Sequence, residues 1–85
     1  MWEEGTFKGL KWSAKIFNEG SKYGINGGRV SKLWVSNGGK IGDREVYLNY
    51  DRGWDIEPKT EEMKQWLDDF LQYVDENIPM YEVEE

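Results

Sequence analysis

The sequence predicts an α+β fold in which an antiparallel sheet of three to four strands carries one C-terminal amphipathic helix on one face. Apolar residues between positions 63 and 78 recur at steps of three and four, which is typical of a helix. Short alternating segments separated by glycine-rich turns fill the first 56 residues, which indicates strands. We expect a single α+β domain over residues 1–78 and an acidic C-terminal tail over residues 79–85.

The helix is the most clearly patterned element. Thr60 is a good N-cap, Glu61 and Glu62 suit the positive end of the helix dipole, and Asn77 and Pro79 supply a stop. Its apolar stripe consists of Met63, Trp66, Leu67, Phe70, Leu71, Val74 and Ile78. Such a stripe predicts that one side of the helix packs against the sheet.

The strands are predicted from alternation and from turn residues. Residues 10–16 alternate apolar and polar side chains, and residues 6–8 can pair with them through a turn at Gly9. Residues 30–35 and 46–50 are two further strands, joined across a connection that contains Asn37-Gly38. This dipeptide favours a type I′ hairpin turn, which needs positive φ at both central positions.

Alternation also assigns each strand residue to a face, provided that the register does not slip. The predicted core is Trp12, Ala14, Ile16, Leu33, Val35, Val46, Leu48 and Tyr50, packed against Trp66, Leu67, Phe70, Leu71 and Val74. The opposite face is then Lys11, Ser13, Lys15, Val30, Lys32, Trp34, Tyr47 and Asn49. Lysines between aromatic rings can hold a stacked, phosphorylated ligand, and they are also ordinary neighbours on a solvated sheet face.

Composition narrows the chemistry. The chain has no cysteine and no histidine, so disulfides, thiolate or imidazole metal sites and the commonest proton shuttle are excluded. We therefore expect a protein that is not an enzyme. Neither a targeting signal nor a run of about 20 apolar residues is present, so we expect no membrane span and a cytoplasmic location.

The formal charge of −6 is unevenly distributed. Residues 1–56 carry nine Lys/Arg and seven Asp/Glu, a net of +2, whereas residues 57–85 carry two lysines and ten acids, a net of −8. A duplex nucleic acid is a poor partner for the acidic part. The front of the chain suits a small anion.

Two glycine-containing loops are candidate ligand sites. Asn26-Gly-Gly-Arg29 and Asp51-Arg-Gly-Trp-Asp55 each combine flexible backbone with an arginine that can grip a phosphate or a carboxylate. The alternative is that the glycines only permit turns and that Arg52 pairs with a neighbouring aspartate. Asp43, Asp51 and Asp55 do not have the spacing of a calcium loop, so no metal site and no cofactor are predicted.

The segments Gly24-Ile-Asn-Gly-Gly-Arg-Val-Ser-Lys-Leu-Trp34 and Asn49-Tyr-Asp-Arg-Gly-Trp-Asp-Ile56, followed by the helix, resemble a family of short uncharacterised proteins. These proteins occur in phages and prophages of Gram-positive bacteria, and the resemblance covers about residues 1–76. It implies a phage accessory protein that binds and blocks a component of the host, which would be an anti-defence function.

Two hypotheses follow. In the first, the chain is a non-enzymatic binding protein that sequesters a small anionic ligand such as a nucleotide signal, with a homo-oligomer deepening its shallow face. The rings that would stack on the ligand are Trp34, Tyr47 and Trp54. The cations that would bind its phosphate are Arg29, Lys32 and Arg52. The polar groups that would form hydrogen bonds with the edges of its base are Asn26 and Asp55. In the second, it inhibits a host effector protein through the acidic helix or exposed tryptophans.

Overall fold

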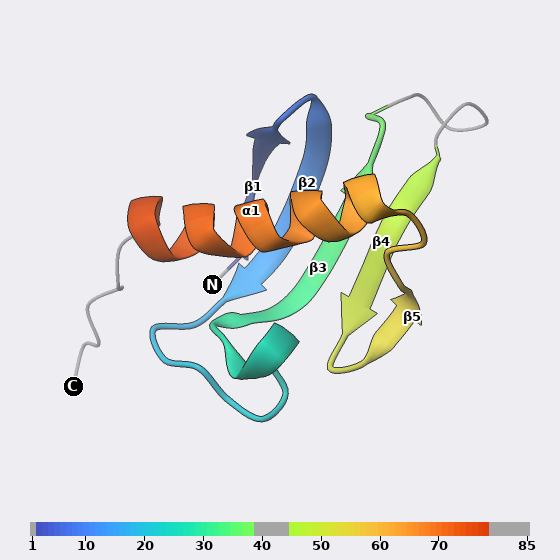
Figure 1. The fold of residues 1–85 in the computed structure, drawn as a ribbon. Helices are drawn as coiled ribbons and strands as arrows, with labels where there is room; N and C mark the ends of the chain where they lie inside the picture. The colour runs from blue at the N-terminus through green and yellow to red at the C-terminus, as the bar shows by residue number, and fades with distance from the viewer. Residues whose placement is uncertain (1, 39–44, 79–85) are drawn as a thin grey trace.

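The computed structural model of the chain describes residues 2–38 and 45–78. In these residues, a five-stranded antiparallel sheet has the strand order β1-β2-β3-β4-β5, and a single α-helix crosses one of its faces (Figure 1). The α+β class and the C-terminal helix are confirmed. The predicted number of strands, three to four, is too low. The predicted acidic tail lies outside the described residues.

Each strand pairs with the next along the chain. The strands are β1 (Trp2–Phe7), β2 (Leu10–Ile16), β3 (Val30–Ser36), β4 (Val46–Asp51) and β5 (Trp54–Ile56). A short 3-10 helix, η1 (Ile25–Gly27), lies in the connection between β2 and β3, and α1 (Glu61–Asn77) follows β5. The Thr60 hydroxyl accepts a hydrogen bond from the Met63 amide at 3.1 Å, which confirms the predicted N-cap.

The β1–β2 and β3–β4 hairpins differ in their turns. Lys8 and Gly9 have φ values of 46° and 82°, as a two-residue type I′ turn requires, and the predicted pairing through Gly9 is confirmed. At the β3–β4 connection Gly38 has φ of 77°, but Asn37 is not among the positive-φ residues. The Asn37 amide donates to the Glu45 carbonyl oxygen at 3.1 Å instead. The hairpin is therefore confirmed, and the predicted type I′ turn at Asn37-Gly38 is wrong.

Strand β5 replaces part of a predicted ligand loop. Arg52 adopts φ of 59° in the turn, and Trp54 and Ile56 then pair with Tyr50 and Asn49 of β4. Three residues after a turn are too short for alternation to reveal a strand. This strand accounts for the difference in strand number.

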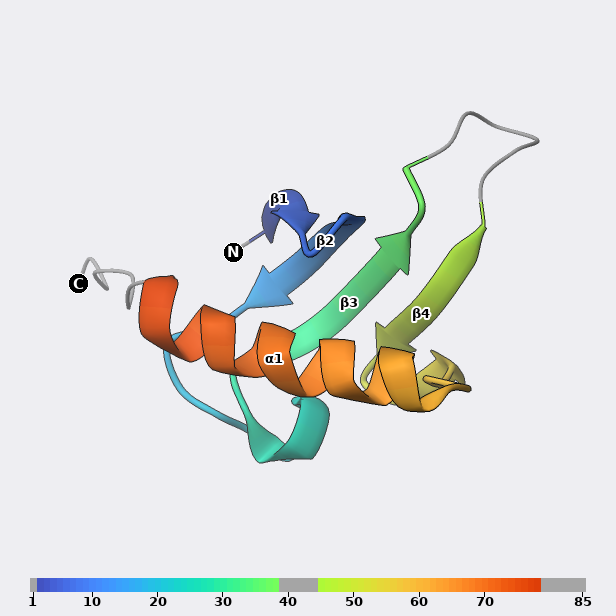
Figure 2. The same cartoon turned by 45° about the horizontal axis from the view of Figure 1, so that its top comes forward.

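The predicted core is largely confirmed. The buried predicted residues are Trp12, Ala14, Ile16, Leu33, Val35, Leu48, Tyr50, Trp66, Leu67, Phe70 and Val74. Val46 and Leu71 are only half-buried, while Ile25 and Val30 join the core. Burial of this cluster between one face of the sheet and α1 (Figure 2) leaves the other face uncovered by any described element.

Two irregularities in register move side chains from one face to the other. Between Lys15 and Ile16 the pairing shifts so that Ile16 lies opposite Val30, and Val30 becomes buried. Between Val35 and Ser36 a second shift omits Tyr47 from the ladder, and Tyr47 packs at the edge of the core. The predicted placement of Val30 and Tyr47 on the uncovered face is therefore wrong, because bulges re-aim side chains.

Candidate functional site

The sheet face opposite α1, here called the outer face, carries a regular array of polar and aromatic side chains. Its members, taken from the strand register, are Trp2, Glu4, Lys11, Ser13, Lys15, Lys32, Trp34, Asn49 and Asp51. They alternate along each strand with residues that face the core, because side chains of a strand point to opposite faces in turn. The outer face is thus built by four neighbouring strands.

Two cross-strand rows organise this face. In one row the register aligns Trp2, Lys15, Lys32 and Asp51, and in the next it aligns Glu4, Ser13, Trp34 and Asn49. The Lys32 ammonium lies 3.5 Å from the Asp51 carboxylate. This ion pair is partly exposed and holds the lysine only weakly. The ammonium remains able to turn toward an incoming anion.

Two hollows lie on the outer face, and Trp34 lines both. The first, of about 190 Å³, is lined on its open side by Trp2, Lys32, Trp34, Asn49 and Asp51. The second, of about 320 Å³, includes Glu4, Lys11, Ser13, Trp34 and Ser36. Each hollow therefore combines a shared indole wall, one lysine, one carboxylate and neutral hydrogen-bonding side chains.

Two exposed aromatic residues extend this surface. Trp2 is 57% exposed and Phe17 is 44% exposed. The Lys15 ammonium lies 5.4 Å from the centroid of the Phe17 ring, so a cation and an aromatic ring are already held together at this corner. Sequence reasoning missed both aromatic residues, although the alternation of Trp2 with Glu4 and Thr6 could have placed Trp2 on this face.

The outer face has the chemistry of a binding surface. Indole rings stack on planar groups, lysines attract anions, and amide and hydroxyl side chains form hydrogen bonds. On β1 to β4, three lysines, Lys11, Lys15 and Lys32, stand against two acids, Glu4 and Asp51. Asp55 of β5, exposed between the core-side Trp54 and Ile56, adds a third acid at the sheet edge, so the described residues of this face have no net charge. Within residues 2–38 and 45–78, no group of three or more Asp or Glu could hold a metal ion.

Lys32 and Trp34 are the predicted site residues that the structure brings together on the outer face. Asn26 and Arg29 lie elsewhere, beside the C-terminal half of α1. The Arg29 guanidinium donates to the carbonyl oxygens of Phe17 at 2.9 Å and Ile78 at 3.0 Å, and only 12% of its side chain is exposed. Arg29 therefore ties the β2–β3 connection to the end of the helix.

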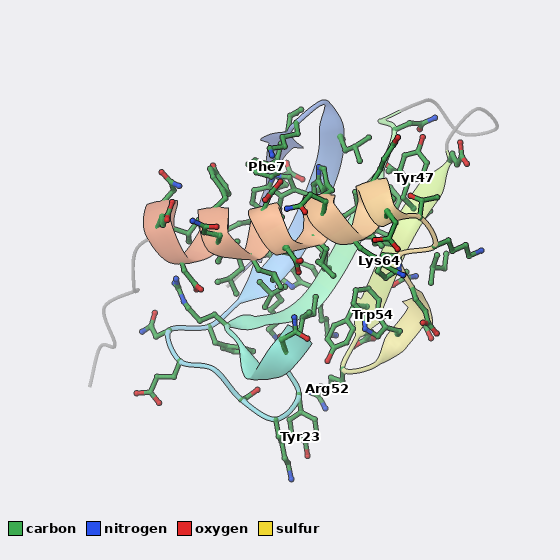
Figure 3. The ribbon with its side chains drawn as sticks, in the orientation of Figure 1. Phe7, Tyr23, Tyr47, Arg52, Trp54 and Lys64 are labelled. Atoms are coloured by element: carbon green, nitrogen blue, oxygen red, sulfur yellow. The ribbon has the colours of Figure 1, made fainter. Side chains whose placement is uncertain are left out.

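The other predicted site residues are also dispersed. Arg52 lies beside Tyr23 at the loop end of the molecule, with its guanidinium carbon 5.7 Å from the Tyr23 ring (Figure 3). Trp54 packs edge-on against Tyr50 of the core, with ring centroids 4.9 Å apart, and Asp55 is exposed on β5. The predicted stacking set of Trp34, Tyr47 and Trp54 is thus divided between the two faces of the sheet.

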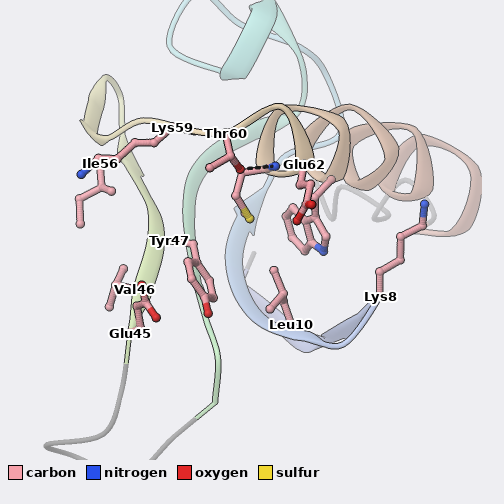
Figure 4. Close-up of a pocket in the computed structure, with 11 residues that line it drawn as sticks. Lys8, Leu10, Glu45, Val46, Tyr47, Ile56, Lys59, Thr60 and Glu62 are labelled. Atoms are coloured by element: carbon pink, nitrogen blue, oxygen red, sulfur yellow. Dashed lines mark hydrogen bonds between the residues drawn. The ribbon is translucent and has the colours of Figure 1, made fainter.

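A larger pocket of about 580 Å³ lies between the first turns of α1 and the sheet (Figure 4). Its apolar lining is Leu10, Val46, Tyr47, Ile56, Met63 and Trp66, and its charged lining is Lys8, Lys59, Glu45 and Glu62. The lysines and glutamates balance, so this pocket selects neither anions nor cations by net charge. It suits an apolar body better than a phosphate.

Lys8 at this pocket is already engaged. Its ammonium donates to the Asp69 carboxylate at 2.6 Å, and the Gln65 amide donates to the same carboxylate at 2.9 Å. The hydrogen bond from Lys8, and to a smaller extent that from Gln65, holds the pKa of Asp69 below its ordinary value of 3.8. The contact joins the β1–β2 turn to the helix.

In the described part of the chain, no helix has the length and apolarity needed to cross a membrane. Residues 1–75 match the sequence pattern of a family described as "Domain of unknown function (DUF7678)". No curated protein and no solved structure matches the chain. The family match covers the whole sheet and most of α1.

Proposed function

We propose that this chain, which belongs to the DUF7678 family, is a non-enzymatic binding protein that holds a small anionic ligand of the nucleotide type on its outer face. The observation that carries the proposal is the position of Trp34. Its indole lines both hollows of the face, with Lys32 in one and Lys11 in the other. A planar base stacked on this indole would place its phosphate within reach of a lysine.

The outer face is favoured over the larger helix-side pocket because its lysine is more weakly held and an exposed indole lies beside it. The helix-side pocket has as many glutamates as lysines, and the Lys8 ammonium is bound to Asp69. Each hollow of the outer face also pairs one lysine with one acid, but the Lys32–Asp51 contact of 3.5 Å is looser than the Lys8–Asp69 contact of 2.6 Å. Trp2 is exposed on this face, and Trp34 is half-buried. A stacked base contributes about 1–3 kcal/mol, and each phosphate contact adds a salt-dependent attraction.

The first test is native mass spectrometry of the protein purified from cells, followed by denaturation and identification of any released molecule. We expect a nucleotide-type molecule bound in stoichiometric amount. A tryptophan-fluorescence titration with adenosine monophosphate (AMP) follows, on the original chain and on Trp34→Ala. We expect Trp34→Ala to lose at least about tenfold in affinity, as stacking energies of that size imply.

Tyr23→Ala is the matched control for that titration. Tyr23 is also an exposed aromatic residue, but it contacts Lys22 and Arg52 and lines neither hollow of the outer face. Its removal should leave the affinity within about twofold. Equal loss in both variants, or saturable AMP binding that Trp34→Ala does not weaken, would contradict the proposed site.

A second candidate function is inhibition of a host effector protein. The observation that favours it is the exposure of Trp2 and Phe17, since partly exposed tryptophan is a common anchor at protein interfaces. Trp2→Ala would then abolish capture of that effector, while AMP would not compete with it. Association with phages and an anti-defence role belong to both candidate functions, and the sequence resemblance alone supports them.

A further inference from the structure

We infer that the ligand of the outer face consists of two linked nucleotide units, which makes it a dinucleotide. This inference rests on the proposed function and names the ligand class of the same site. It starts from the fact that Trp34 stands between two hollows, each of which has its own lysine.

The sizes of the hollows argue against one enclosed mononucleotide. Pockets that enclose small ligands usually measure about 300–1,000 Å³. The hollow with Lys32, about 190 Å³, lies below this range, and the hollow with Lys11, about 320 Å³, only reaches its lower limit. Each hollow is therefore suited to one planar base with part of its sugar and phosphate. Neither surrounds a ligand sufficiently for tight binding by itself.

The polar groups are arranged in the same way in both hollows. The first offers the Lys32 ammonium and the Asn49 amide beside the Asp51 carboxylate, and the second offers the Lys11 ammonium and the Ser13 hydroxyl beside the Glu4 carboxylate. In each hollow a cation can meet a phosphate, and a neutral hydrogen-bonding group can meet a base edge. This repetition on either side of Trp34 fits a ligand that itself repeats.

Trp2 provides a second stacking surface for the first hollow. Trp2 lies on β1 and Trp34 on β3, two strands and one register row apart. With strands about 4.8 Å apart and a rise of about 3.4 Å per residue, the two Cα atoms are separated by about 12 Å. A base in this hollow thus has an indole at either end, while the linked unit passes over Trp34 into the second hollow.

Linkage supplies the affinity that neither hollow provides alone. When one unit is bound, the second binds intramolecularly, and such linkage typically raises overall affinity by about 10²- to 10⁴-fold. We therefore expect a dinucleotide to bind much more tightly than AMP. Linear and cyclic dinucleotides share the necessary chemistry of two bases joined by phosphate.

The experiment is isothermal titration calorimetry of the full chain with three probes: AMP, the linear dinucleotide pApA and cyclic di-AMP. The same three probes with uracil in place of adenine test whether the site prefers a pyrimidine base. We expect at least one dinucleotide to bind one per chain and about 100-fold or more tighter than its mononucleotide. Preference for the linear form would identify a nucleic-acid fragment as the source, and preference for the cyclic form a cyclic nucleotide.

Lys11→Gln is the diagnostic variant, because Lys11 belongs to the second hollow only. In the original chain we expect the dissociation constant of the mononucleotide to exceed that of the dinucleotide by a large factor. Lys11→Gln should reduce this ratio of dissociation constants at least about tenfold. Lys64→Gln is its matched control, with the same loss of charge on α1, where Lys64 forms an exposed ion pair with Glu61. That control should keep the full ratio, and circular dichroism shows that each variant is folded.

Two results would overturn the inference, and they can be told apart. If mononucleotides bind and the dinucleotides bind no more than about threefold tighter, the two-unit ligand is wrong and the proposed function stands. If no probe of either series binds the folded chain, the proposed function and this inference both fail. A ratio that Lys11→Gln leaves unchanged would also overturn the assignment of the second hollow.

Discussion

The guanidinium of Arg29 donates a hydrogen bond of 3.0 Å to the carbonyl oxygen of Ile78, at the C-terminal end of α1. The same Nη1 atom lies 3.3 Å from the Val74 carbonyl oxygen. The Val74 carbonyl also accepts from the Ile78 amide at 3.0 Å, whereas the Ile78 carbonyl lies beyond the helix, and cations are favourable at a helix C-terminus. An arginine that the sequence suggested as a ligand group is therefore a clamp between the β2–β3 connection and the helix end.

Replacing this arginine should destabilise the fold. Arg29→Ala removes hydrogen bonds from a charged, mostly buried donor and leaves carbonyl groups without a partner, which should cost about 2–3 kcal/mol of unfolding free energy. The Asp75 contact at 3.9 Å is exposed and adds little. Urea denaturation measures the change, with Lys64→Ala as a control expected within about 0.5 kcal/mol. If Arg29→Ala lowers the unfolding free energy no more than the control does, these hydrogen bonds do not stabilise the fold.

Gly5 should resist substitution by alanine. In a strand, alanine is normally better than glycine by about 0.5–1 kcal/mol. At Gly5, however, a Cβ atom would lie 3.3 Å from the Trp12 ring, and Trp12 is only 4% exposed and packs edge-on against Phe70. We expect Gly5→Ala to lose about 1 kcal/mol or more through overpacking. Thermal unfolding beside the exposed control Glu4→Ala decides the sign, and a stabilised Gly5→Ala would contradict this packing.

The Lys8–Asp69 contact should make stability depend on pH at the acid end. The pKa of Asp69 is lowered in the folded chain, so the contact stabilises the fold above the ordinary value of 3.8. Its contribution is lost as the pH falls through the lowered folded pKa. Carboxyl NMR titration should show the Asp69 pKa rising in Lys8→Gln and staying low in Lys64→Gln. An Asp69 pKa that is the same in all three proteins would exclude Lys8 as the cause.

Ligand binding to the outer face should weaken with salt. Each phosphate that a lysine neutralises makes the affinity fall with salt. The slope of log affinity against log salt concentration is about −0.7 per contact for a single-stranded nucleic acid and shallower for a ligand with one or two phosphates. Lys32→Gln should therefore make the slope shallower, by at most about 0.7, while Lys59→Gln at the helix-side pocket should leave it unchanged. Titrations at about 50 to 300 mM NaCl, a range over which the Debye length falls by more than half, measure this slope. If the salt dependence has the same slope in both variants, Lys32 does not contact the phosphate.

Local patterns were sufficient to predict the helix, its cap and most of the core. Thr60 caps α1 because its hydroxyl suits an N-terminus whatever surrounds it, and Phe70 is buried because it lies in the middle of an apolar stripe. Alternation in β2 placed Trp12 and Ala14 correctly for the same reason. These features depend on residues a few positions apart.

The errors came from features that depend on distant residues. Tyr47 faces the helix side because β3 and β4 change register at Val35, and no pattern within β4 encodes that shift. Arg29 meets carbonyls 45 and 49 residues further along the chain, so its structural role cannot be predicted from its own loop. Of the predicted site residues, Lys32 and Trp34 lie together because a regular strand places them two positions apart.

The most direct test of the central claim is a two-dimensional amide NMR titration with AMP. Because Trp34 and Lys32 lie on β3 and Lys11 and Ser13 on β2, we predict that the largest shifts fall in these two strands and in the indole N–H of Trp34. Residues of the helix-side pocket, such as Ile56 and Met63, should stay still. Shifts centred on Ile56 and Met63, with β2 and β3 unmoved, would contradict the assignment of the ligand site to the outer face.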